Sequence, residues 1–247
     1  MNAIASRLRL RSDSGFSLVE LVVTMGIMGV VLGGLATIFV SGERASADAT
    51  ARMTSQQNVR VAFDRLEYDA RCADTATLLN KTGSNGAGVY LHLPTQCAHA
   101  SGTVTWCITS GSLTRNTGTT CPGTALTYVT SVTSATPFSC YTPVAGTLPQ
   151  IKVLLTVNPS TRNSDKTSGT DYITMHNVPT TYNISATALP AGTITVASTA
   201  GFPTAGSLST SNGTIAYTGT TATTFTGATG GTGTLAANAA VVLVGCS

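Results

Sequence analysis

Residues 16–40 read FSLVELVVTMGIMGVVLGGLATIFV, an apolar segment in which Glu20 is the only charged residue. As an α-helix, a segment of this length measures about 37 Å, more than the ~30 Å hydrocarbon thickness of a bilayer. The preceding residues 1–15, MNAIASRLRLRSDSG, are basic, and basic residues beside a membrane helix favour the cytoplasmic side. We therefore expect residues 16–40 to form a single membrane-spanning helix with its N-terminus in the cytoplasm.

Three other interpretations of this segment fit less well. A secretory signal has a shorter apolar core followed by a small-residue cleavage site, whereas here Ser14 and Gly15 precede the core. A plain signal anchor fits the length but leaves Glu20 unexplained, because a carboxylate in a membrane helix is costly and usually functional. A buried helix of a soluble protein would show a polar face, which is absent.

The run Gly15-Phe16-Ser17-Leu18-Val19-Glu20 resembles the cleavage and methylation motif of type IV pilins and type II secretion pseudopilins. The resemblance implies that a prepilin peptidase cuts between Gly15 and Phe16, that the new amine of Phe16 is N-methylated, and that Glu20 serves filament assembly. It also implies partners: the inner-membrane assembly platform, and other pilin subunits bound through the N-terminal helix. The precursor would lie in the cytoplasmic membrane and the mature subunit in an extracytoplasmic filament.

The chemistry of Glu20 agrees with such a role. Cleavage would leave a positive charge at Phe16, at the positive end of a helix dipole, and Glu20 lies one turn further along. Because losing one partner of a buried ion pair costs about 3–5 kcal/mol, Glu20 would select the register of neighbouring subunits. Glycines at 26, 29, 33 and 34 would allow close helix approach.

Residues 41–80 are predicted to continue the helix as an amphipathic segment, to about Leu79. An apolar stripe with helical spacing supports this, formed by Val59, Phe63, Leu66, Ala70 and Ala73. Opposite charges four residues apart, which we expect to be solvated, lie on the other faces: Arg60–Asp64, Arg65–Asp69 and Glu67–Arg71.

Residues 81–178 are predicted to form a β-rich head. Short runs with β-propensity alternate with Gly, Ser, Pro and Asn, at 89–93, 103–109, 126–130, 150–157 and 172–176, and Gly111 marks a hairpin. Together with the helix they predict an α+β fold, a long helix packed on an antiparallel sheet. Residues 56–76 and 104–115 resemble J-type minor pseudopilins and related large minor pilins, and a large head favours a subunit of low abundance.

Residues 186–247 differ from the head, since no Asp, Glu, Lys or Arg follows Asp171, and nineteen later residues are threonine. Alternating runs predict a small all-β module with strands at 193–197, 207–210, 214–218, 223–226 and 240–244. Residues 193–233 resemble a small β-module of bacterial surface and phage structural proteins, a resemblance that implies no chemistry. A disordered, glycosylated tail is the alternative. We expect the module to be removable without loss of the head, and its uncharged surface to suit a glycan or other surface ligand.

Six cysteines and a membrane segment indicate disulfides formed in an oxidising compartment. Fifteen complete pairings are possible. We favour Cys107 with Cys121, because these residues flank a turn-rich hairpin.

Other functional classes find little support. His92, Cys97 and His99 lack the paired ligands of zinc modules, so we interpret Cys97 as a disulfide cysteine beside surface histidines. The glycine-rich residues 83–88 precede a strand and read as a turn, and Trp106 reads as a core residue. We expect no enzyme activity, no metal, no cofactor and, without a basic stripe, no nucleic-acid partner.

The predicted function is therefore that of a minor pilin or pseudopilin that primes or caps a filament. The alternative is a tip adhesin or substrate-docking subunit that acts through the C-terminal module. Whether the filament is a type IV pilus, a type II secretion pseudopilus or a DNA-uptake pseudopilus stays open at this point.

Overall fold

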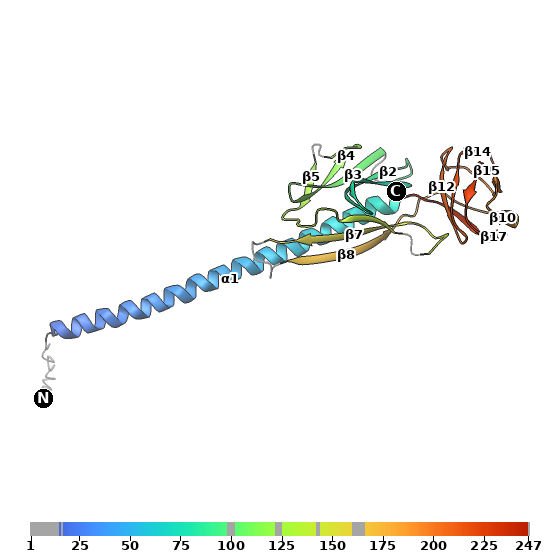
Figure 1. The fold of residues 1–247 in the computed structure, drawn as a ribbon. Coiled ribbons are helices and arrows are strands. Elements are labelled where there is room, and N and C mark those ends of the chain that lie inside the picture. The colour runs from blue at the N-terminus through green and yellow to red at the C-terminus, as the bar shows by residue number, and fades with distance from the viewer. Residues whose placement is uncertain are drawn as a thin grey trace, which may run out of the picture. The chain divides into compact units, whose positions relative to one another are not determined.

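The computed structural model describes residues 15, 17–97, 102–121, 125–141, 144–159 and 166–246. The chain divides into two compact units, Met1–Thr50 and Ala51–Ser247. One long helix, α1 (Leu18–Cys72), begins in the first unit and ends in the second, where antiparallel strands follow it (Figure 1). The α+β class predicted from the sequence is confirmed.

Helix α1 ends at Cys72, eight residues before the predicted end near residue 80, and this expectation was wrong. Strand β1 (Thr75–Thr82) follows and pairs with β2 (Asn85–Leu93) through a turn in which Gly83 has a positive φ of 63°. Ala76 and Leu78 are buried while Thr77 is exposed, which is the two-residue period of a strand. Pairing with β2 and burial of these two side chains outweigh the helical pattern that precedes them.

The head contains one eight-stranded antiparallel sheet. Its strand order is β5-β4-β3-β2-β6-β7-β8, and β1 pairs with β2 beside this path. The remaining strands are β3 (Gly102–Thr109), β4 (Ser112–Thr117), β5 (Leu126–Val129), β6 (Phe138–Tyr141), β7 (Gln150–Val157) and β8 (Thr167–Thr174). The predicted hairpin is present, because β3 and β4 are joined at Ser110 and Gly111.

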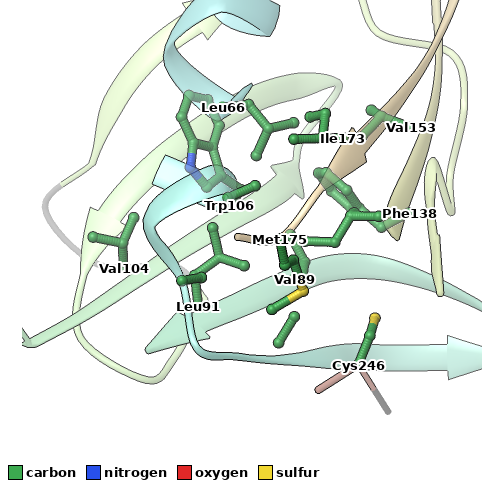
Figure 2. Close-up of a cluster of buried hydrophobic side chains, with 14 of the residues drawn as sticks. Leu66, Val89, Leu91, Val104, Trp106, Phe138, Val153, Ile173, Met175 and Cys246 are labelled. Atoms are coloured by element: carbon green, nitrogen blue, oxygen red, sulfur yellow. The ribbon is translucent and has the colours of Figure 1, made fainter. Parts of the chain in front are cut away.

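The core of the head lies between the second half of α1 and this sheet. Figure 2 shows Leu66 of α1 near Trp106 and Ile173 of the sheet, and all three side chains are buried. Phe63 is half-buried and covers Gly169 of β8, where an added Cβ would lie 2.8 Å from Phe63 Cε2. The stripe predicted for α1 is therefore the face that packs on the sheet.

The C-terminal residues form small antiparallel sheets around a second core, rather than an unstructured tail. This core consists of buried side chains that include Ile194, Leu208, Ile215, Phe225 and Leu235. The strands are β9 (Thr180–Tyr182), β10 (Thr187–Leu189), β11 (Thr193–Thr195), β12 (Gly206–Thr210), β13 (Gly213–Tyr217), β14 (Gly219–Thr220), β15 (Thr224–Thr226), β16 (Thr229–Gly230), β17 (Gly233–Leu235) and β18 (Ala240–Leu243).

The first and last strands of this module are neighbours. β9 pairs with β18, and the Leu243 amide donates a hydrogen bond of 3.0 Å to the Pro179 carbonyl. After β18 the chain returns to the head, where Cys246 forms a parallel bridge with Ala76. Val242, Leu243 and Cys246 are buried in the head's core. The module is thus inserted between Pro179 and Val242, and a cut after Val178 would remove part of the head's core, contrary to the expectation from the sequence.

All six cysteines are paired in the structure. The bonds are Cys72–Cys97, Cys107–Cys121 and Cys140–Cys246. The pair favoured from the sequence is one of them.

Candidate functional site

The candidate site begins at the N-terminus of α1. The Ser17 carbonyl accepts hydrogen bonds from the amides of Glu20 and Leu21, at 3.0 and 3.1 Å, so the helix starts directly after Ser17. Gly15 and Ser17 are exposed. Phe16 lies outside the described residues. Glu20 is in the first turn of α1, where the unsatisfied amides and the helix dipole favour a negative charge.

Beyond Glu20, the apolar side chains of α1 are exposed as far as Val40. This helix is the one candidate membrane span in the described part of the chain, and its most apolar stretch has no residue buried within the protein. An exposed apolar surface of this size marks a site of contact with a membrane or with another protein. A bilayer, or the helices of other subunits, would cover it.

The hydroxyl groups of this segment are satisfied within the helix. Thr24 donates to the Leu21 carbonyl at 2.9 Å, Thr37 to Gly34 at 2.7 Å, and Ser41 to Ile38 at 2.8 Å. Polar groups without partners are costly in an apolar medium. These hydroxyls have partners, so the Glu20 carboxylate is the group of residues 18–40 that would require a counter-charge in an apolar environment.

Three glycines line one side of this segment. Gly26, Gly29 and Gly33 are spaced by three and four residues, so they share a helix face. An added Cβ at any of them would meet no atom within 4 Å. The absence of side chains along this face permits the backbone of another helix to approach closely.

A buried ion pair connects the second half of α1 to the sheet. Asp69 is 1% exposed, and its carboxylate accepts hydrogen bonds from Arg115 Nε at 2.6 Å, Arg115 Nη2 at 3.2 Å and Trp106 Nε1 at 3.0 Å. Burial of Arg115 opposes its charge, but the hydrogen bond and the attraction of Asp69 outweigh burial and raise the pKa of the guanidinium.

The expectation that Asp69 belongs to a solvated face was therefore wrong. Its i,i+4 partner Arg65 does lie 3.7 Å away, but Asp69 is on the buried side of α1 beside Ala70. The spacing of Arg65 and Asp69 could not reveal Arg115, because that residue is 46 positions further along the chain.

The remaining sequence candidates that the structure describes have partners of other kinds. Cys97 is bonded to Cys72, and His92 Nδ1 lies 2.7 Å from Asp74 Oδ1. His99 lies outside the described residues. Within the described ranges, no group of three His, Cys, Asp or Glu side chains could hold a metal ion. Trp106 is fully buried.

The comparisons with known proteins agree with the geometry of the N-terminus. A family model described as the prokaryotic N-terminal methylation motif matches residues 10–36. No curated protein and no solved structure shows significant similarity to the chain. The chain thus carries the prepilin motif of type IV pilins and pseudopilins at the start of an apolar helix, which indicates a membrane-anchored precursor, processing by prepilin peptidase and assembly with other pilin-type subunits.

Proposed function

We propose that this protein is a minor pilin or pseudopilin that primes or caps an extracytoplasmic filament. Prepilin peptidase removes residues 1–15, the amine of Phe16 is methylated, and α1 then joins the helices of neighbouring subunits. The observation that carries the proposal is the position of Glu20 in the first turn of α1. It is the one charged residue of this helix as far as Val40, and the large apolar side chains of that segment are exposed.

This helix leaves the bilayer when the subunit joins a filament. Its apolar surface then packs against other helices, and the Phe16 ammonium requires a negative partner. Glu20 meets that requirement within its own subunit or from a neighbour. A subunit without the carboxylate leaves an unpaired charge in an apolar environment, at a cost of about 3–5 kcal/mol.

The test compares Glu20→Gln with Glu43→Gln, which removes an exposed charge further along the same helix. We expect both variants to be cleaved normally. Recovery of Glu20→Gln in the filament fraction should fall by more than about tenfold, since 1.4 kcal/mol already corresponds to a factor of ten, while Glu43→Gln assembles like the unaltered protein. Normal recovery of Glu20→Gln would refute the assembly role.

A second candidate function rests on the C-terminal module. Thr193 and Thr195 of β11 pair with Thr226 and Thr224 of β15, and the intervening Ile194 and Phe225 are buried. The outer face of these strands therefore presents hydroxyl groups and no charge. Such a surface suits hydrogen bonding to a neutral glycan, and the protein would then be a tip adhesin or substrate-docking subunit.

A further inference from the structure

A different surface, on the head, presents exposed aromatic side chains. Residues of β7 alternate: Ile151 and Val153 are buried in the core, and Gln150 and Lys152 point to the opposite face. The register places Tyr141 of β6 opposite Gln150, and Lys152 opposite Tyr172 of β8. We call the surface formed by Tyr141, Gln150, Lys152, Tyr172 and Thr174 the tyrosine face.

The two tyrosines of this face touch each other yet remain open to solvent. Their ring centroids are 5.2 Å apart with an interplanar angle of 63°, an edge-to-face contact. Tyr141 is 43% exposed and Tyr172 46% exposed. The contact restrains both rings, so a ligand that stacks on them would meet side chains that are already ordered.

The tyrosine face also carries one positive charge and a pair of hydrogen-bonded polar side chains. Lys152 Nζ lies 5.4 Å from the centroid of Tyr172, and Lys152 is the one basic residue in β6, β7 and β8. Lys152 takes part in none of the ion pairs that the described residues form. Gln150 donates a hydrogen bond of 2.9 Å to Thr174. Asp171 of β8 accepts a hydrogen bond from the Tyr172 amide.

We propose that the tyrosine face binds a polysaccharide whose sugar rings carry carboxylates. The C–H faces of the sugars would stack on Tyr141 and Tyr172, the sugar hydroxyls would bond to Gln150 and Thr174, and a carboxylate would pair with Lys152. Exposed aromatic rings beside amide and hydroxyl groups match a sugar ring, because a sugar ring presents C–H groups on its faces and hydroxyl groups around its edge. Lys152 lies beside these aromatic rings and has no carboxylate partner in the described part of the chain, so it selects an anionic sugar. This site is independent of the module and of the proposed filament role.

The test uses the full-length protein in a zwitterionic detergent without a sugar head group. Calorimetry measures the binding of an oligogalacturonate and of its methyl ester, which has the same rings but no charge. We expect the acid to bind more tightly, with a preference that weakens as salt increases. Lys152→Gln should abolish this preference. Tyr141→Ala and Tyr172→Ala should each lower the binding affinity for both ligands by about tenfold or more.

Matched controls are Tyr182→Ala, which removes another exposed tyrosine, and Lys81→Gln, which removes another exposed lysine; neither should alter binding. Tyr172→Phe keeps the ring and should bind like the unaltered protein, and the fluorescence of Trp106 reports whether each variant is folded. The proposal is overturned if neither ligand binds, if the preference survives Lys152→Gln, or if the tyrosine variants bind normally but fail to enter filaments. The last result would assign the face to contact between subunits.

Discussion

Cys140 and Cys246 form a disulfide that joins β6 of the head to the end of the chain, across a sequence separation of 106 residues. Cys246 is buried in the same core as Leu66 and Trp106. The last residues of the chain therefore belong to the head, although the module between Pro179 and Val242 has a core of its own.

The Cys140–Cys246 disulfide should contribute more to the free energy of unfolding than the Cys107–Cys121 disulfide. Replacing both Cys140 and Cys246 by serine should lower the free energy of unfolding by about 2–4 kcal/mol. Without the bond, the long loop between these residues is no longer closed in the unfolded chain, whose conformational entropy therefore increases. Urea unfolding followed by Trp106 fluorescence measures this loss of stability. The control replaces Cys107 and Cys121, whose separation is 14 residues. Its loss should be about 1–2 kcal/mol smaller, and an equal or larger loss in the control would contradict the prediction.

The insertion of the module predicts different outcomes for two deletions. Joining Pro179 to Val242 through a short glycine linker should leave the head folded, because this variant keeps Val242, Leu243 and Cys246 of the head's core. The two ends already lie close together, since the Leu243 amide bonds to the Pro179 carbonyl. Truncation after Val178 should destabilise the head, since it removes Cys246 and leaves Cys140 as a free thiol. Mass spectrometry of free thiols and the urea midpoint distinguish the two variants. Equal stability of both would show that the returning segment contributes nothing to the head.

Asp69→Ala should be among the most harmful single substitutions in the head. It leaves the largely buried guanidinium of Arg115 and the Trp106 indole N–H without their acceptor, so we expect a loss of about 3–5 kcal/mol. Urea unfolding in detergent measures it, and Trp106 is the single tryptophan of the chain. Asp64→Ala removes an exposed carboxylate from the same helix and should change stability by no more than about 0.5 kcal/mol. A similar loss in both variants would argue against the buried pair.

Processing can be tested by intact-mass analysis of the filament-associated protein. The mature chain should begin at Phe16 and carry the mass of one added methyl group. Gly15→Leu places a bulky side chain at the expected cleavage position, where the glycine has open space around it. We expect this variant to accumulate as an uncleaved membrane precursor, and Gly42→Leu, a change at an equally open glycine further along α1, to be cleaved normally. Cleavage at any other bond would refute the assignment.

The features that the sequence by itself determined are those that depend on neighbouring residues. The apolar run 16–40, the motif from Gly15 to Glu20 and the stripe of α1 are contiguous or periodic, so their meaning can be read along the chain. Strands such as β2, β3 and β7 of the head and β12, β13 and β18 of the module were predicted for the same reason, since β-propensity and turn residues act locally. Strands β1 and β6 of the head were not predicted.

The tertiary structure alone decided what depends on distant partners. The helix stops at Cys72 because residues 75–82 pair with β2, and Asp69 is buried because Arg115 and Trp106 meet it from other strands. The same holds for Cys246, whose partner Cys140 is brought near when the chain returns from the module. Such contacts depend on how the chain closes its loops, and no local pattern of residues encodes that closure.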